Sequence, residues 1–372
     1  MIDRADVAIV GAGMAGASLA AEIAGEASVL ILEAESQPGY HSTGRSAAFW
    51  SEIYGGPLIQ PLTTASGDFL AAPQTDFADE PFLRPRGAVH VADADGRERL
   101  DTLAARFAGS SVALAAMDRA ALESAIIGLR PGWDWGLCEP TVADIDVSRL
   151  HAAYLKRARA RGARLVAGAR VEQARREGGR WRIETGAGPF EAAILVDAAG
   201  AWADEVAVAA GESPLGIQPF RRTIAQLRID PPAPSSLPLV VDARQRFYFK
   251  PEAGGRLWLS PHDETASGPV DCAPEEIDVA LAIDRMEQVV DWRVERVERS
   301  WAGLRSFAPD RLPVYGFAPG GRAFFWCAGQ GGFGIQTAPA AAKLAAALLL
   351  GRAPDVLVAG IDPVPYLAER LA

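Results

Sequence analysis

Three glycines near the start of the chain have the spacing that binds the diphosphate of a dinucleotide. Residues 11–16 read GAGMAG, follow the short apolar run 7–10 and lead into an Ala/Leu pattern typical of a helix. Gly11 can make the tight turn, Gly13 admits a pyrophosphate close to the backbone, and Gly16 lets the helix pack against the strand. The first helical turn then offers its unpaired N–H groups to phosphate oxygens.

An acidic residue follows where such sites hold a ribose. Glu33 ends the next apolar run, 29–32, about 20 residues beyond the first glycine. Its carboxylate could accept both hydroxyls of an adenosine ribose and would repel a 2′-phosphate, which disfavours NADP. Strand, glycines, helix, strand and acid occur in order, so we expect a dinucleotide site instead of a structural turn. The motif does not choose between FAD and NAD.

The elements that must position this motif indicate an α/β fold. Buried strands are predicted at 7–10, 29–32 and 192–196, and amphipathic or apolar helices at 147–160 and 338–350. Alternating segments between 81 and 139 and between 217 and 302 predict a second region of β-sheet. The predicted fold class is therefore a Rossmann-like nucleotide domain with a second, mixed β-sheet domain.

Composition limits the classes of partner. The 372 residues are 49% hydrophobic and 23% charged, which disfavours a disordered chain. The formal net charge of −10 disfavours nucleic acid and anionic membranes as partners. The cysteines Cys138, Cys272 and Cys327 lack CxxC spacing and indicate a reducing compartment. No signal peptide appears, and the apolar run 338–350 is too short to span a bilayer. We expect a cytoplasmic protein with a small-molecule substrate, no transmembrane segment and no metal.

Longer motifs along the chain resemble the D-amino-acid oxidase superfamily of flavoproteins, and within it most resemble bacterial D-arginine dehydrogenases. The matching segments are the glycine motif with Glu33, PGYHSTGRSAA (38–48), ADID (143–146), PLGIQPFRR (214–222), FYFKP (247–251), WAGLRSF (301–307) and QGGFGIQT (330–337). The resemblance implies noncovalent FAD, since no cysteine matches the attachment site of related sarcosine oxidases. It also implies a discontinuous FAD-binding domain, 1–80, 140–216 and 303–372, and a substrate domain, 81–139 and 217–302.

The same resemblance assigns residues to the cofactor. Residues 42–48 would run along the isoalloxazine ring, Val171 would meet the adenine, and 331–337 would border the flavin carbonyls. The full cofactor set is Gly11, Gly13, Met14, Ala15, Gly16, Glu33, Ser42, Thr43, Gly44, Arg45, Ser46, Ala47, Ala48, Val171, Ala199, Gly200, Trp202, Gly303, Gly331, Gly332, Gly334, Ile335, Gln336 and Thr337.

The resemblance also assigns residues to a substrate carboxylate. These are Arg222, Arg305, Tyr248 and Tyr54. A planar guanidinium can bind a carboxylate bidentately, which supports the two arginines independently. The Gly332 carbonyl would accept a hydrogen bond from the substrate amine, and Gln336 would support the site. Without the resemblance, arginines are more often in structural ion pairs and tyrosines in the core.

Two departures change the expected substrate. Ala88 aligns with the glutamate that pairs with the substrate guanidinium in D-arginine dehydrogenase, and Phe49 aligns with an active-site histidine. Apolar side chains give a cationic substrate no partner. We therefore expect a neutral, hydrophobic D-amino acid in place of D-arginine.

The implied reaction is oxidative deamination of a D-amino acid to a 2-oxo acid and ammonia, by hydride transfer to flavin N5. Alternatives on the same scaffold are oxidation of a secondary amine, an imino acid or a 2-hydroxy acid. A flavin protein that transfers electrons without turning over a small molecule is a further alternative. The sequence leaves open whether oxygen or a quinone-type carrier accepts the electrons, and it does not predict the oligomeric state.

Overall fold

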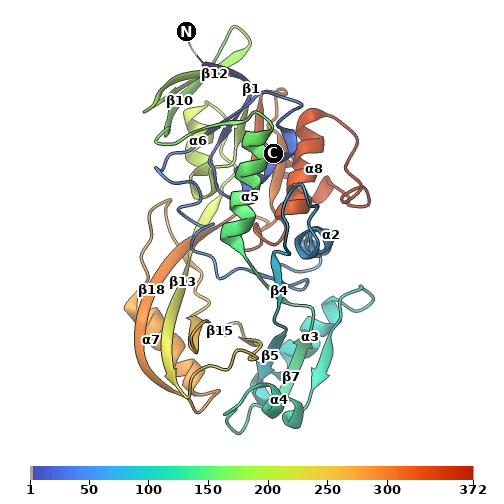
Figure 1. Ribbon diagram of the computed structural model, residues 1–372, viewed down its shortest axis with the longest axis vertical. Helices are drawn as coiled ribbons and strands as arrows, with labels where there is room; N and C mark the ends of the chain where they lie inside the picture. Colours follow the sequence, from blue (N-terminus) through green and yellow to red (C-terminus); the bar gives the residue numbers. More distant parts are fainter. Residues whose placement is uncertain (1–2, 372) are drawn as a thin grey trace.

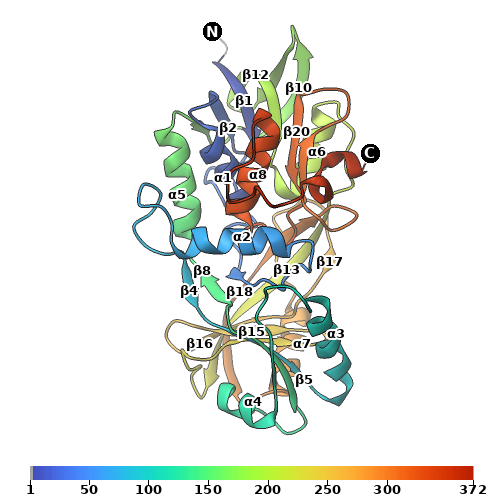
Figure 2. The same cartoon turned by 90° about the vertical axis from the view of Figure 1, so that its right-hand side faces the viewer.

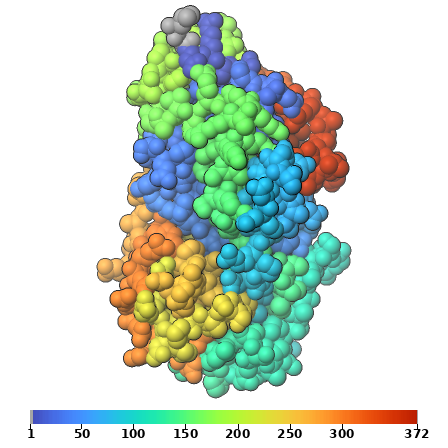
Figure 3. Space-filling model, in the orientation of Figure 1, coloured from blue at the N-terminus to red at the C-terminus, as the bar shows by residue number. Residues whose placement is uncertain are grey.

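The computed structural model describes residues 3–371 and shows two β-sheet regions stacked along the long axis of the molecule (Figure 1). One region contains an eight-stranded sheet, the other a nine-stranded sheet, and a three-stranded sheet lies between them (Figure 2). The space-filling view shows the yellow and orange segments of the second region against the blue and green segments of the first (Figure 3). The predicted α/β class is confirmed.

The eight-stranded sheet carries the glycine motif at the carboxyl end of its central strand. Its strands are β1 (Asp3–Val10), β2 (Val29–Leu32), β9 (Arg164–Val166), β10 (Val171–Glu177), β11 (Arg180–Thr185), β12 (Gly188–Asp197), β19 (Val314–Phe317) and β20 (Phe324–Ala328). The pairs β9–β2, β2–β1, β1–β12 and β12–β20 are parallel. Their apolar runs are buried because helices cover both faces.

Alternate residues of β1 and β2 belong to different cores. One core contains Val7 and Ile9 and packs against α1 (Met14–Ile23), α5 (Val147–Ala160) and α8 (Ala338–Leu350). The other packs on the opposite face with α6 (Ala203–Ala209). The predicted helix 147–160 is confirmed, and Asp146 caps it by accepting from the N–H of Arg149 at 3.1 Å.

The nine-stranded sheet forms the second region. Its strands are β5 (Ala88–Ala92), β6 (Ala115–Met117), β7 (Trp135–Glu139), β13 (Gln218–Asp230), β14 (Leu239–Asp242), β15 (Tyr248–Glu252), β16 (Arg256–Ser260), β17 (Thr265–Ala266) and β18 (Arg293–Phe307). The helix α7 (Glu276–Glu287) packs on one face of this sheet, over a core that includes Phe247 and Phe249. The other helices of this region are α3 (Arg97–Arg106) and α4 (Arg119–Ala125).

The connection between the regions consists of short strands and one long strand pair. The short strands are β3 (Phe49–Trp50), β4 (Leu83–Pro85) and β8 (Ala143–Ile145), next to α2 (Gln60–Ala71). The pair β13 and β18 extends from the second sheet toward the first region (Figure 1). The predicted domain division at 302/303 falls inside β18, while β13 begins one residue after the division at 216/217. Among residues 3–371, no helix has the length and apolar character needed to cross a membrane.

Candidate active site

A single cavity of about 480 Å³ extends from the glycine motif to the second sheet. Both β-sheet regions contribute to its wall, and most of the predicted site residues lie there. Those that line it are Gly11, Gly13, Met14, Ala15, Glu33, Ser42, Thr43, Arg45, Ser46, Ala47, Val171, Ala199, Gly200, Trp202, Arg222, Tyr248, Gly303, Arg305, Gly331, Gly332, Gly334 and Ile335.

The glycines of the motif are required by close backbone approaches. Gly11 has φ +98°, and a Cβ there would lie 2.5 Å from the carbonyl oxygen of Ala198. A Cβ at Gly16 would lie 2.0 Å from the carbonyl oxygen of Gly11, so any side chain there would push the helix from the strand. Gly13, Met14 and Ala15 line the cavity where α1 begins, which is where a pyrophosphate would bind.

Glu33 lies at the end of β2 and is almost fully buried. One carboxylate oxygen accepts from the N–H of Ala12 at 2.7 Å, and the other accepts from the N–H of Glu35 at 2.9 Å. These two bonds fix the carboxylate beside the glycine turn, and each oxygen can still accept a second hydrogen bond. The position therefore suits a ribose next to the diphosphate.

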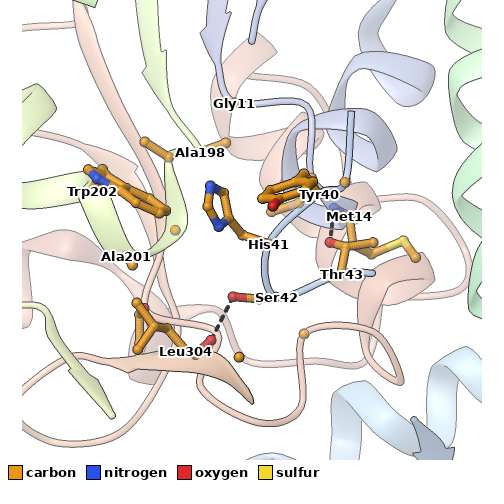
Figure 4. A pocket seen from close by; sticks show the side chains of 18 of the residues that line it. Gly11, Met14, Tyr40, His41, Ser42, Thr43, Ala198, Ala201, Trp202 and Leu304 are labelled. Carbon is orange, nitrogen blue, oxygen red and sulfur yellow. Dashed lines mark hydrogen bonds between the residues drawn. The ribbon is translucent and has the colours of Figure 1, made fainter. Parts of the chain in front are cut away.

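The loop that follows β2 is tied to both regions (Figure 4). The Ser42 hydroxyl donates to the carbonyl of Leu304 at 2.6 Å, and the Met14 N–H donates to the Thr43 hydroxyl at 3.0 Å. The ring of His41 lies near Trp202, with centroids 4.5 Å apart. These contacts hold the loop along one side of the cavity.

Several lining residues were not predicted. Tyr40 and His41 lie in the segment 38–48 that the sequence singled out, and Arg170 and Glu172 flank the predicted Val171. Their positions next to predicted residues in the sequence could have indicated these four. Glu205, on α6, also lines the cavity, and we find no sequence signal for it.

Strand register brings the two predicted arginines together. In the antiparallel pair β13–β18, Arg222 lies opposite Gly303, and Arg305 is two residues further along β18. Residues directly opposite, and residues two apart on one strand, share a face of the sheet. Arg222 and Arg305 are thus diagonal neighbours on the face toward the cavity. The lack of a side chain at Gly303 makes room for Arg45, whose Cβ would lie 3.2 Å from a Cβ at that position.

Two polar side-chain atoms at this end of the cavity lack hydrogen-bond partners within the described chain. The Arg222 Nε donates to the carbonyl of Asp263 at 2.7 Å, but its Nη1 is buried and has no hydrogen-bond partner among residues 3–371. The buried Tyr248 hydroxyl is also without a partner in that range. Arg305 donates through Nη1 to the Tyr54 hydroxyl at 2.6 Å. Unpaired buried donors are costly, so this end of the cavity suits a ligand that accepts hydrogen bonds.

A family model described as FAD dependent oxidoreductase, DAO, matches residues 6–348. The chain belongs to the DAO family. FAD is therefore its cofactor, as predicted, and the glycine cradle, Glu33 and the cavity that continues to the arginines fit this molecule. No cysteine of the described chain lines the cavity, which agrees with noncovalent binding.

Several known proteins are similar to this chain over nearly its whole length. A glycine oxidase of Pseudomonas aeruginosa is 27% identical over 372 residues, 97% of each chain. The crystal structure of glycine oxidase from Geobacillus kaustophilus has a TM-score of 0.84 at 24% identity and covers 98% of each chain. That of L-proline dehydrogenase from P. horikoshii has a TM-score of 0.82 at 17% identity and covers 96% of each. None of these three is a D-arginine dehydrogenase, so that closer likeness stays a prediction.

The arginine pair of this DAO-family site is positively charged at neutral pH. Burial and the charge of Arg305 lower the pKa of Arg222 to about 10. Burial also acts to lower the pKa of Arg305, but Tyr54, Tyr248, Glu264 and Asp263 outweigh it, so this pKa is raised. Asp263 and Glu264 lie 4.0 and 3.5 Å from Arg222, but Asp263 also pairs with Arg221 and Glu264 with Arg311, so these carboxylates do not neutralise the pair fully. The pair thus favours an anion.

The remaining predicted residues surround the cavity without lining it: Gly16, Gly44, Ala48, Phe49, Tyr54, Ala88, Gln336 and Thr337. Gly16 lies at the helix–strand contact, and the N–H of Gly44 closes a turn onto the carbonyl of Gly39 at 2.8 Å. The Ala48 N–H donates to the Ser46 hydroxyl at 3.1 Å. The Thr337 hydroxyl donates to the Phe333 carbonyl at 2.8 Å.

The predicted substrate residues outside the lining differ in how close they come to the arginines. Tyr54 contacts Arg305, and the Phe49 ring lies between Tyr54 and Tyr248, with centroids 5.7 and 6.0 Å away. Ala88 is buried in the second sheet. Gln336 contacts the Tyr54 carbonyl, not a cavity surface.

Proposed function

We propose that this protein oxidises a neutral, hydrophobic D-amino acid to an imino acid, which water hydrolyses to a 2-oxo acid and ammonia. The observation that carries the proposal is the unpaired Nη1 of Arg222 beside Arg305 at the end of the FAD cavity. Two guanidinium groups on one sheet face suit a carboxylate, and the Tyr248 hydroxyl can donate to the same group. When bound, FAD supplies the two-electron acceptor.

The chain's own residues would bind and orient the substrate. Arg222 and Arg305 would hold the carboxylate, and the Gly332 carbonyl would accept from the amine. The positive charge of the arginines favours the neutral amine of the substrate over its ammonium form. The neutral amine is the form that can be oxidised. No side-chain base is then needed. The rings of Phe49, Tyr54 and Tyr248 would exclude water from this end of the cavity.

The surrounding carboxylates favour a neutral substrate side chain. Asp263 pairs with Arg221, and Glu264 pairs with Arg311 and Arg222. Glu139 accepts three hydrogen bonds from the loop that begins at Ser51. A cationic side chain would find none of these three free, and its burial without a partner is costly. Ala88 and Phe49 add apolar surface at the predicted side-chain end.

Glycine or a secondary amine is the second candidate substrate. The names of the relatives support it, since two are glycine oxidases and one is an L-proline dehydrogenase. These substrates share the α-carboxylate and would use the same arginines. Chirality at the α-carbon, the electron acceptor and a cytoplasmic location stay predictions from the sequence.

Anaerobic reduction of the FAD-loaded protein tests the proposal. Separate D- and L-amino acids, glycine, sarcosine, 2-hydroxy acids and simple amines without a carboxylate would be mixed with the protein, and loss of the flavin's visible absorbance recorded. We expect rapid bleaching by neutral D-amino acids and slow or no bleaching by D-arginine. Bleaching by amines that lack a carboxylate, at the same rate, would overturn the role of the arginines. Admission of air then separates oxidase from dehydrogenase.

A further inference from the structure

A buried carboxylate behind the site holds the segment that carries Tyr54. Glu139, the last residue of β7, is 0% exposed. One of its oxygens accepts from the Ser51 hydroxyl at 2.7 Å, and the other accepts from the N–H groups of Glu52 at 2.7 Å and Ile53 at 3.4 Å. These donors belong to three consecutive residues, and the next one is Tyr54.

The same segment is held from its other side by Gln336, just before α8. The side-chain oxygen of Gln336 accepts from the N–H of Ser51 at 3.1 Å, and its nitrogen donates to the Tyr54 carbonyl at 3.2 Å. The nitrogen also donates to the Thr63 hydroxyl at 2.9 Å, which fixes the amide's orientation. Gln336 thus holds the backbone of the segment 51–54 at its two ends, and Glu139 accepts from the two backbone N–H groups between them.

Little space is available for Tyr54 to shift. A Cβ at Gly332 would lie 2.2 Å from the Tyr54 hydroxyl and 3.2 Å from the central carbon of the Arg305 guanidinium. The ring also contacts Phe333 at 5.7 Å between centroids. A small change in residues 51–53 would therefore move the hydroxyl away from Arg305 or into the backbone at Gly332.

The register of the second sheet explains why this carboxylate faces the site. Glu139 lies directly opposite Ala88 in the antiparallel pair β5–β7, so both side chains share a face. On the neighbouring strands, Leu239 pairs with Ala88 and Val241 pairs with Tyr248, which extends that face to the Tyr248 hydroxyl. Glu139 acts on this side of the sheet through the segment 51–54 and does not itself line the cavity.

We propose that Glu139 is a positioning residue: its carboxylate holds residues 51–53 so that Tyr54 orients Arg305 for the substrate carboxylate. This inference rests on the proposed function of the arginine pair. Glutamine keeps the shape of the side chain, accepts from the same backbone N–H groups and can donate to Ser51, so Glu139→Gln should preserve the position. Leucine has a similar volume but accepts no hydrogen bond.

The test compares Glu139→Gln and Glu139→Leu as FAD-loaded proteins, with Glu123→Leu as the control on an exposed glutamate of α4. For Glu139→Leu we expect unchanged FAD content, KM for the best amino-acid substrate raised by about tenfold or more, and kcat changed much less. Glu139→Gln should stay within about threefold of wild type in both constants. Tyr54→Phe added to Glu139→Leu should cause little further loss, because both changes remove the same contact.

Amide hydrogen exchange tests the hold of Glu139 on residues 51–53 without requiring any turnover. The amides of Glu52 and Ile53 should exchange at least about tenfold faster in Glu139→Leu than in Glu139→Gln or wild type, whether or not an amino acid is oxidised. If wild type oxidises no amino acid but exchange changes as expected, the proposed function fails and the hold on the segment stands. Unchanged exchange, an unchanged KM in Glu139→Leu, or full additivity with Tyr54→Phe would overturn the inference.

Discussion

The two ends of the cavity are built in different ways. At the dinucleotide end, the glycines 11–16 and Glu33 lie within one strand–helix–strand unit, and only the approach of Ala198 to Gly11 comes from a distant segment. At the arginine end, Tyr54 and Arg305 are 251 residues apart in sequence and meet through a single hydrogen bond. Local spacing thus encodes the cofactor end, whereas strand pairing between distant segments creates the substrate end. The two ends should therefore respond differently to mutation.

The most general effect should come from the dinucleotide end, because a change there removes the cofactor and with it all turnover. Gly16→Val places atoms where even a Cβ would lie 2.0 Å from the Gly11 carbonyl oxygen, so α1 must move and the phosphate site is lost. We expect FAD content after purification to fall by about tenfold or more, measured from the flavin absorbance of released cofactor. Gly268→Val is the matched control, because no atom lies within 4 Å of a Cβ at that position. Normal FAD content in Gly16→Val would show that the close approach is not required.

Substitutions at the arginine end should weaken substrate binding and leave the FAD content of the protein unchanged. Arg305→Ala or Arg222→Ala removes a charged partner of the buried substrate carboxylate. We expect this loss to cost about 2–5 kcal/mol of transition-state stabilisation, or roughly 30- to 4,000-fold in kcat/KM. Arg296→Ala, on the same strand but with a side chain 63% exposed, should change kcat/KM by less than about twofold. An Arg305→Ala protein with wild-type kcat/KM would contradict the assigned role.

This contrast explains how much the sequence could predict. The glycine motif, Glu33 and the helix at 147–160 follow from periodicity and spacing, and the structure confirms the predicted fold class. The arginines are brought together by the register of β13 and β18, which no local pattern specifies, so the family resemblance was needed to select them. Glu139 was missed because two of its three donors are backbone N–H groups, which leave no trace in the sequence.

Behind the arginine end, the carboxylate of Glu139 should destabilise the fold as the pH rises. Burial raises its pKa from 4.5 to about 7, against the opposing effect of its hydrogen bonds from Ser51, Glu52 and Ile53. The folded protein then binds more protons than the unfolded chain between about pH 4.5 and 7, so this group lowers stability progressively across that window. Glu139→Gln should therefore be more stable than wild type above pH 7, by up to about 3 kcal/mol, with the difference shrinking toward pH 4.5.

Denaturant unfolding at several pH values would measure this difference. A constant difference between the two proteins from pH 4.5 to 8 would show that Glu139 titrates normally. The comparison also shows whether the carboxylate that holds residues 51–53 lowers the free energy of unfolding.

The smallest expected effect sharpens the assignment at the arginine end. Tyr248→Phe removes a buried hydroxyl that has no partner in the described chain and that would donate to the substrate carboxylate. We expect a loss of about 1.5 kcal/mol, or roughly tenfold in kcat/KM. Tyr154→Phe is the matched control, since its buried hydroxyl also lacks a partner within residues 3–371 but lies in the core around α5. Equal effects of the two changes would remove Tyr248 from the site.

A crystal structure of the FAD-loaded protein with a small carboxylate that cannot be oxidised, such as acetate, tests the central claim most directly. The account predicts that the carboxylate oxygens lie about 2.7–2.9 Å from guanidinium nitrogens of both Arg222 and Arg305, with the methyl carbon toward the flavin ring. A carboxylate bound elsewhere, or an Arg222 Nη1 that still has no partner in that complex, would contradict it.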